Sequence, residues 1–249
     1  MAAPTSSSSS QPPAQPPLLT PATERTSFAP PPTHPNLHVL SHPLYQHQLA
    51  HLRLSPADTD ARAFRMRTRA AATVLCVEAT RDLEVQAVKG MGPLAGFEGD
   101  TVKERIGVVP ILRAGLGLVD ACLDLLPDDT SVLHIGLFRE KKSLQPIEYY
   151  SKLPAQPTVD RVLIVDPLVA TGGTAIACVH MIQDWGIPAD KIKFLCLLGS
   201  EVGIKTLLDA CPGIEVWCGH IDQTLDAEGL IIPGLGDAGD RLFSTLAQH

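Results

Sequence analysis

The 249-residue sequence has no uninterrupted apolar stretch of about 18 residues, so it predicts no membrane-spanning helix. Its amino terminus lacks the apolar core of a secretory signal peptide. Basic residues are not in excess, because the formal net charge is −7 and the pI is near 5.7. This charge argues against broad, non-specific binding to nucleic acids, which depends on Lys and Arg neutralising phosphates. A small anionic ligand is still compatible with it, because a pocket can be basic on an acidic protein.

Paired-cysteine motifs are also missing. None of the six cysteines forms a C-x-x-C pair, and most of them lie in apolar segments. We therefore interpret them as buried, reduced thiols, which fits a reducing compartment. They are Cys76, Cys122, Cys178, Cys196, Cys211 and Cys218.

Residues 1–35 differ in composition from the rest of the chain, with ten of the 22 prolines and the serine run Ser6–Ser10. Such a segment cannot bury enough apolar surface to offset the entropy of ordering it. We therefore predict a disordered tail (1–35) and one domain (36–249). A Ser-rich, acid-poor tail is also half of a transit-peptide signature, but the arginines are missing. We expect a cytoplasmic protein, with an organelle such as a plastid as the alternative.

From about Pro43 the sequence predicts an α/β fold. Two helices come first, at 42–54 and 60–83. Nearly continuous apolar strands then alternate with helices, which predicts a mostly parallel sheet flanked by helices on both faces. Pro146 makes 143–153 an edge or hairpin strand, because proline donates no ladder hydrogen bond. The other strands are predicted at 105–113, 131–139, 161–166, 191–199 and 214–221, and the helices at 114–126, 173–185 and 201–211.

A row of basic residues marks one face of the second predicted helix. Arg62, Arg65 and Arg69 have the spacing i, i+3, i+7. We interpret this face as a solvated or subunit-facing stripe, with an anion site as the alternative.

Polar residues stand where three predicted strands end. Arg113 and Arg139 end two strands, and Asp166 ends a third and leads into "PLVATGGT". Ligands of open α/β sheets bind outside the carboxyl ends of the strands. Two arginines beside a glycine-rich loop therefore predict a site for a highly anionic ligand.

The loop 166–174 has the residues of a phosphate cradle. Gly172 and Gly173 let backbone N–H groups face a ligand, the following helix adds unpaired N–H groups, and Thr171 and Thr174 add hydroxyls. The alternative is a tight turn in which one threonine caps the helix. Asp166 favours the ligand, because an ionised carboxylate only accepts hydrogen bonds and suits vicinal ribose hydroxyls. The loop thus predicts a ribose 5-phosphate site, and it has neither the Walker A nor the G-x-G-x-x-G pattern.

A second unusual segment is "GLIIPGLGDAGDRLF" (Gly229–Phe243), with four glycines between Gly229 and Gly239. Glycine-dense loops bring backbone N–H and C=O groups close to a ligand, and such groups can recognise a planar, amide-like heterocycle. The alternative is a solvent-exposed closing loop, which the apolar residues before it disfavour.

Three motifs together resemble the uracil phosphoribosyltransferase family: "VVPILRAGLG", "IVDPLVATGGT" and "IIPGLGDAGDRLF". The resemblance covers about 200 residues from His42 onward, in the same order and spacing, and leaves out the tail. It implies the type I phosphoribosyltransferase fold. It also implies conversion of uracil and 5-phosphoribosyl 1-diphosphate (PRPP) to UMP and diphosphate, with Mg²⁺ carried by PRPP.

The resemblance also implies roles for residues. Arg113 and Arg139 would face the diphosphate, beneath a flexible hairpin flap that follows Arg139. Asp237 would reach the PRPP–Mg²⁺ side, either as the base that takes the uracil N1 proton or by organising the metal. With Arg113 and Asp166 it completes the expected catalytic set. The PRPP loop would be Asp166, Pro167, Leu168, Val169, Ala170, Thr171, Gly172, Gly173 and Thr174, and the uracil-reading segment Ile231, Gly236, Asp237 and Ala238.

Some expectations concern assembly and departures from the family. Relatives suggest a homodimer or homotetramer, and some are activated by GTP, although the sequence shows no GTP site. Leu230 stands where the family usually has Tyr. We therefore keep a catalytically silent ligand-binding or regulatory protein as the alternative function. The acidic charge disfavours a third one, an RNA regulator.

Overall fold

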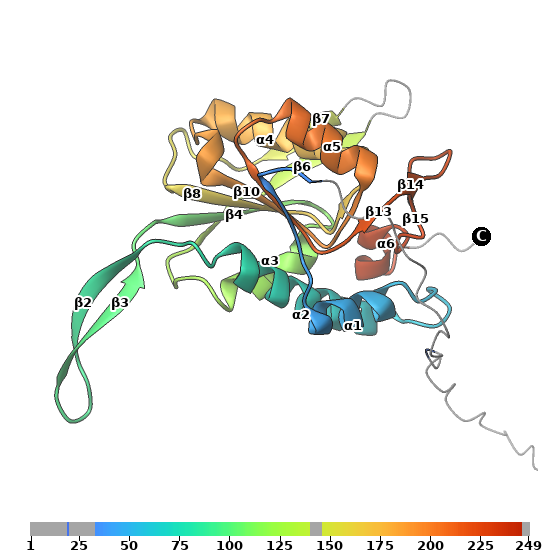
Figure 1. Cartoon of the computed structure of the whole chain (residues 1–249). Helices are drawn as coiled ribbons and strands as arrows, with labels where there is room; N and C mark the ends of the chain where they lie inside the picture. Colours follow the sequence, from blue (N-terminus) through green and yellow to red (C-terminus); the bar gives the residue numbers. More distant parts are fainter. Residues whose placement is uncertain (1–18, 20–32, 140–145, 246–249) are drawn as a thin grey trace, which may run out of the picture.

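The computed structural model describes residues 33–139 and 146–245, together with Leu19. Most of the predicted tail and the tip of the predicted flap (140–145) lie outside these residues. The boundary between tail and domain at residue 35 therefore stays a prediction. The described chain folds as an α/β structure with helices on both faces of a central sheet, as predicted (Figure 1).

The central sheet has eight strands in the order β1-β12-β10-β8-β4-β6-β7, with β5 paired to β4. Every pair in it is parallel except β6–β7. The three middle strands are apolar and buried along almost their whole length, which is why helices must cover both faces. The strands are β1 (Leu37–Val39), β4 (Ile106–Leu112), β5 (Ser131–Val132), β6 (Ile135–Arg139), β7 (Pro146–Ser151), β8 (Arg161–Val165), β10 (Ile192–Cys196) and β12 (Glu215–Cys218).

Two helical layers enclose the sheet. Helices α1 to α3 lie on one face and α4 and α5 on the other, each over its own hydrophobic core (Figure 1). A short 3-10 turn, η1, precedes β10, and α6 lies at the edge where the parallel strands end. The helices are α1 (Pro43–Leu52), α2 (Ala61–Ala79), α3 (Leu116–Leu123), α4 (Gly173–Trp185), η1 (Ala189–Lys191), α5 (Glu201–Ala210) and α6 (Ala238–Phe243).

The two N-terminal helices begin at side-chain caps that the sequence provides. The His42 ring accepts a hydrogen bond from the Leu44 amide, and Pro43 takes the first helical position. The Asp60 carboxylate accepts one from the Ala63 amide at 2.7 Å. In the basic row of α2, Arg65 donates to the Leu242 carbonyl and Arg69 pairs with Asp124. These contacts are within the chain, so they do not decide between the two interpretations of the row.

Smaller sheets complete the fold. A three-stranded parallel sheet, β13-β11-β9, continues above the carboxyl ends of the central strands. The predicted strand 191–199 is divided between β10 and β11, because the Leu197 and Leu198 amides both donate to the Pro167 carbonyl. The predicted strand 131–139 is likewise divided into β5 and β6. The strands are β9 (Leu168–Val169), β11 (Leu198–Ser200), β13 (Ile221–Asp222), β14 (Thr224–Leu225) and β15 (Ile231–Ile232).

A hairpin that sequence reasoning did not predict extends away from the body (Figure 1). It consists of β2 (Val85–Met91) and β3 (Gly96–Val102), paired in antiparallel register. Six of the seven residues of β2 are exposed. The hairpin therefore has no buried face, and the apolar-and-polar pattern that identifies a strand in a sequence is missing.

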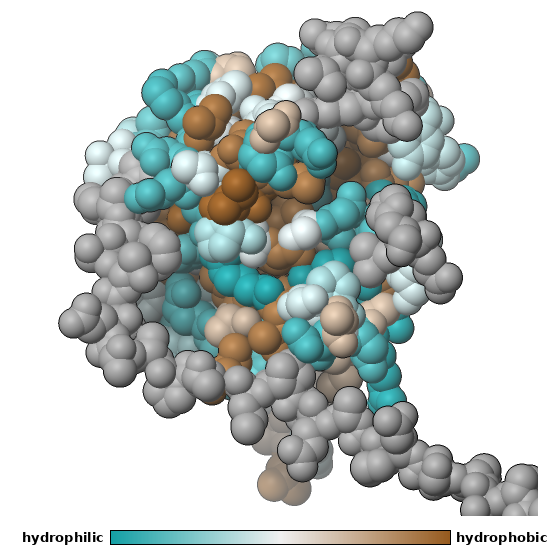
Figure 2. All heavy atoms as spheres, turned by 90° about the vertical axis from the view of Figure 1, so that its right-hand side faces the viewer, coloured by the Kyte–Doolittle hydropathy of each residue, from teal (hydrophilic) through white to brown (hydrophobic). Residues whose placement is uncertain are grey.

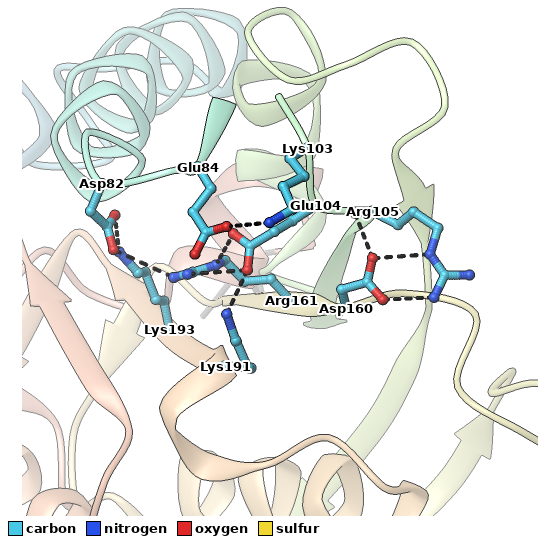
Figure 3. Close-up of polar contacts among 9 residues, drawn as sticks. All are labelled: Asp82, Glu84, Lys103, Glu104, Arg105, Asp160, Arg161, Lys191 and Lys193. Carbon is cyan, nitrogen blue, oxygen red and sulfur yellow. Dashed lines mark hydrogen bonds and ion pairs between the residues drawn. The ribbon is translucent and has the colours of Figure 1, made fainter. Parts of the chain in front are cut away.

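Ion pairs fix the root of this hairpin at the amino ends of the central strands (Figure 3). Lys103 pairs with Glu84 across the hairpin at 2.9 Å. Glu104, just after it, is held by Arg161 at 2.9 Å and Lys191 at 2.6 Å. We call this group the hairpin-root cluster; it comprises Asp82, Glu84, Lys103, Glu104, Arg105, Asp160, Arg161, Lys191 and Lys193.

Two further sequence predictions are confirmed. All six cysteines are buried and free. Strand β7 forms the outer edge of the central sheet, with Pro146 at its start. Within the described ranges, no helix has the length and apolar content that crossing a membrane requires.

Candidate active site

The carboxyl ends of three neighbouring strands bring the predicted residues to one edge of the sheet. Strand β4 lies between β8 and β6. Asp166 follows β8, Arg113 follows β4, and Arg139 is the last residue of β6. Figure 2 shows this side of the molecule, where hydrophilic residues surround a hollow with hydrophobic residues at its floor. The Arg139 side chain lies outside the described part of the structure.

The loop after β8 ends in a helix with an open amino terminus. Gly172 is the N-cap residue of α4, at φ +88°, and as a glycine it makes no side-chain hydrogen bond to cap this helix. The alternative in which Thr171 or Thr174 is the N-cap is therefore wrong. A Cβ on Gly172 would come within 2.8 Å of the Gly203 carbonyl oxygen, so the close packing of loop and α5 also requires glycine. The N-cap position therefore offers no side-chain acceptor to the first N–H groups of α4.

A cavity of about 260 Å³ lies in front of this loop. It is closed on the other side by Glu228, Gly229 and Leu230, from the turn between β14 and β15. Leu230 is 45% exposed and faces the glycine-rich loop across this cavity. The other lining residues are Asp166, Leu168, Val169, Ala170, Thr171, Gly172, Thr174 and Ala175.

Asp166 lies at the floor of the cavity and is partly exposed. Burial raises the pKa of its carboxyl to about 7, and the neighbouring charge of Asp237 acts in the same direction. A hydrogen bond from the Leu168 backbone acts against this rise. The two carboxyl groups therefore repel each other when both are ionised, and a cation or hydrogen-bond donors between them would lower that pKa.

A second cavity, of about 580 Å³, is lined by Arg113 and Asp237. Arg113 is half exposed and donates to Asp240 at 3.0 Å and to Thr245 at 3.2 Å. Asp237 is the N-cap residue of α6, and its Oδ1 accepts from the Asp240 amide at 2.9 Å. The remaining lining residues are Leu112, Ala114, Leu137, Tyr149 and Gly239.

Sequence reasoning missed one residue that lines this second cavity, Tyr149, and one that binds its arginine, Asp240. Asp240 is the second acid of "GDAGD", and the sequence gives its charge. Its contact with Arg113 could not be predicted, because the two residues are 127 positions apart. Tyr149 comes from β7, the strand of the predicted flap, and its ring packs over Gly136 of β6. The hairpin β6–β7 thus borders the cavity from the side opposite α6.

The glycine-rich segment 229–243 is partly buried and contains β15 and α6. Ile231 lies in β15 and is buried, Ala238 begins α6 and is buried, and Gly236 has φ +74°. Asp237 connects this segment to the Arg113 cavity. The segment is therefore not a solvent-exposed loop along its whole length, although Gly236 and Asp237 are themselves exposed.

No preformed metal site exists in the described ranges, where no group of three or more His, Cys, Asp or Glu residues could hold an ion. Two carboxylates nevertheless interact electrostatically, Asp166 in the lining of the first cavity and Asp237 in the lining of the second. Mg²⁺ is commonly held by one or two carboxylates together with the phosphates of its substrate. The arrangement fits a metal that arrives with a phosphorylated ligand.

Comparison with known proteins gives a consistent result. The family model described as uracil phosphoribosyltransferase matches residues 39–245. The uracil phosphoribosyltransferase of Roseiflexus castenholzii is 45% identical over 207 residues, which cover 83% of this chain and 97% of the relative. That of Listeria welshimeri is 42% identical over 211 residues, or 84% of this chain and 99% of the relative.

A solved structure, the AQ2163 protein from Aquifex aeolicus, aligns with a TM-score of 0.78 and 30% identity. The alignment covers 86% of this chain and all of that one. The family match spans the central sheet, both helical layers and the two cavities at the carboxyl edge. The chain belongs to the uracil phosphoribosyltransferase family.

Proposed function

We propose that this protein transfers the 5-phosphoribosyl group of PRPP to N1 of uracil, giving UMP and diphosphate. The observation that carries the proposal is the amino terminus of α4, which begins at a glycine N-cap and follows Asp166 on one sheet edge with Arg113. Backbone N–H groups at a helix start bind a phosphate well. A carboxylate next to them needs donors, and the two ribose hydroxyls provide these.

The parts of the site have complementary tasks in this reaction. The bond between ribose C1 and the diphosphate oxygen breaks, the C1–N1 bond forms, and uracil loses its N1 proton. Negative charge grows on the leaving diphosphate, where Arg113 and Arg139 stabilise it. Loop residues 167–174 hold the 5-phosphate. Ile231, Gly236 and Ala238 present the backbone that recognises uracil.

Mg²⁺ enters this proposal as a partner of PRPP. Asp237, and Asp166 through its ribose contact, are the residues that would lie beside it. When bound, the ion supplies positive charge to the diphosphate. Asp237 is also the candidate acceptor of the N1 proton. Its Oδ1 caps α6, so Oδ2 would accept the proton.

Assembly into a homodimer or homotetramer is a further part of the proposal, and the hairpin β2–β3 supports it. Its exposed apolar side chains include Met91, Leu94 and Phe97, and Leu94 is fully exposed. Isolated two-stranded hairpins are marginally stable in water, and exposed apolar patches mark interaction sites. The hairpin-root cluster joins residues at the base of the hairpin to residues at the amino ends of the central strands (Figure 3). Sedimentation of the Leu94→Asp/Phe97→Asp variant should show a smaller species than the wild type.

Activation by GTP and a cytoplasmic location also remain proposals. GTP is tested by adding it to the turnover assay, where a higher rate at fixed substrate is expected. Location is tested by comparing fluorescent fusions of the full chain and of residues 36–249. Transport of the full chain alone into an organelle such as a plastid would support the transit-peptide alternative.

The activity itself is tested with purified protein, uracil, PRPP and Mg²⁺, followed by chromatography for UMP. We expect one UMP and one diphosphate for each uracil consumed. If PRPP binds but no UMP forms, with or without GTP, the protein is a silent ligand-binding relative. Leu230, in place of the family's Tyr, is the sequence feature that favours this second candidate.

A further inference from the structure

Arg53 and Asp222 form a buried ion pair behind the base-reading segment. The two guanidinium nitrogens each donate to one carboxylate oxygen, and both N···O distances are 2.8 Å. The Asp222 side chain is 1% exposed and that of Arg53 21%. Bidentate pairs of this kind fix direction as well as distance. The pair joins the end of α1 to β13, 169 residues further along the chain.

The same two side chains hold one residue of the segment 231–238 by both of its backbone groups. Arg53 donates to the Gly234 carbonyl at 2.9 Å, and the Gly234 amide donates to Asp222 at 3.0 Å. Gly234 has φ +57°, and a Cβ there would overlap the Ile231 carbonyl. Two hydrogen bonds and the close approach of the Ile231 carbonyl therefore constrain the position of Gly234. The ion pair thus binds the segment 231–238 at Gly234 through both backbone groups of that residue.

Strand β13 also connects Asp222 to the phosphate loop. Asp222 is in register with Ser200 of β11, and Gly199 of the same strand is in register with Val169 of β9. Ser200 additionally donates to the Ala170 carbonyl, within the loop. The three-stranded sheet thus contacts the loop at its β9 edge. At its β13 edge, Asp222 binds Gly234.

We propose that Arg53 and Asp222 are positioning residues that set the base-reading segment at a fixed distance from the PRPP loop. This inference rests on the proposed function. Neither side chain touches the reacting atoms in our assignment; both act through Gly234. Misplacing a substrate by about 1 Å can reduce the rate of reaction 10²-fold. The pair therefore controls how uracil is presented to the ribose.

Kinetics of single variants of the full chain test this role. In Arg53→Gln we expect the KM for uracil to rise by about 10- to 100-fold, while the KM for PRPP changes by less than about threefold. Arg53→Lys keeps the charge but cannot make the bidentate contact of a guanidinium. Its KM for uracil should therefore lie between those of the wild type and Arg53→Gln. An unchanged KM for uracil in Arg53→Gln, or equal rises for both substrates, would overturn the proposal.

Arg105→Gln is the matched control. Arg105 also makes a bidentate pair, with Asp160 at 3.0 and 2.6 Å, but at the opposite end of the central strands (Figure 3). Its KM values should equal those of the wild type. The same rise in the KM for uracil as in Arg53→Gln would show a general effect of lost ion pairs and would overturn the positioning role.

Amide hydrogen exchange separates this proposal from the proposed function. Peptides covering 231–238 should exchange faster in Arg53→Gln and in Asp222→Asn than in wild type or Arg105→Gln. Unchanged exchange overturns the positioning role whatever the turnover. Faster exchange together with no UMP from the wild-type protein would leave the positioning intact and refute the proposed function. If Asp222→Asn fails to fold, the Arg53 variants decide alone.

Discussion

Arg113 donates a hydrogen bond to the carboxylate of Asp240, with an N···O distance of 3.0 Å. Thr245 accepts from the same guanidinium and donates to the same carboxylate at 2.6 Å. The hydrogen bond from Thr245, followed by that from Arg113, lowers the pKa of Asp240 despite partial burial. A cation proposed to face the diphosphate is thus held in place by an ionised acid on α6.

Replacing Asp240 should therefore weaken the use of PRPP. In Asp240→Asn, Arg113 loses a charged partner, and exposed pairs of this kind contribute about 0.2–1 kcal/mol. We expect kcat/KM for PRPP to fall by about two- to fivefold with the KM for uracil unchanged. Steady-state kinetics with each substrate varied in turn measures this. Tighter PRPP binding in the variant would show instead that Asp240 competes with the ligand for Arg113.

The pH dependence of PRPP binding should report Asp166. Its carboxyl has a pKa of about 7 in the free protein, and only the ionised form is a pure acceptor for ribose hydroxyls. PRPP affinity, measured by calorimetry with Mg²⁺, should rise by up to about tenfold per pH unit below pH 7 and become level above pH 8. The phosphates of PRPP also titrate, so Asp166→Asn is the control. In this variant the part of the pH dependence that comes from Asp166 should be absent, and only the part that comes from PRPP should remain. A wild-type profile identical to that of Asp166→Asn would contradict this assignment.

Stability should have the opposite pH dependence. The pKa of Asp166 is higher in the folded protein than its unfolded value of about 3.9, so the folded state holds the proton more tightly. The stabilisation from protonated Asp166 is fully present below about pH 4. It is lost as the pH rises toward 7, so the free energy of unfolding decreases over this range. Denaturant unfolding of wild type and Asp166→Asn at pH 5 and pH 8 measures it. We expect the variant to gain relative stability at pH 8.

Two glycines at the ends of α4 give a matched pair of substitutions. Gly172 and Gly186 both have positive φ, at +88° and +117°. Alanine at either should destabilise the protein by about 1 kcal/mol or more, because L-residues rarely adopt this conformation. Only Gly172→Ala should also raise the KM for PRPP, since Gly186 lies at the far end of the helix. Equal PRPP kinetics in the two variants would exclude the phosphate-cradle role of the loop.

Much of the fold was predictable because its core strands are apolar and buried on both faces. The helix 173–185 was predicted with its observed bounds, from an apolar strand, a glycine turn and a helical pattern in succession. The hairpin β2–β3 was missed because it buries neither face. Helix α6 was missed because its glycines suggest a loop, whereas Asp237 caps it.

Part of the site was also predictable from the sequence. Residues at strand ends, such as Arg113 and Asp166, are found from local sequence because topology alone gathers them at one edge. Pairs such as Arg53 with Asp222 leave no local pattern, since the partners are 169 residues apart and each is an ordinary charged residue in its own segment. Only the folded chain shows that both bind Gly234.

The central claim, that Asp166 holds the ribose of PRPP beside the phosphate cradle, is tested most directly by kcat/KM for PRPP in Asp166→Asn. The substitution keeps the shape of the side chain and removes its charge. Hydrogen bonds to charged groups contribute about 1.5–3 kcal/mol each, so losing two should lower kcat/KM by about 10²- to 10⁴-fold. A value within about threefold of the wild type, in a variant that remains folded, would contradict the account.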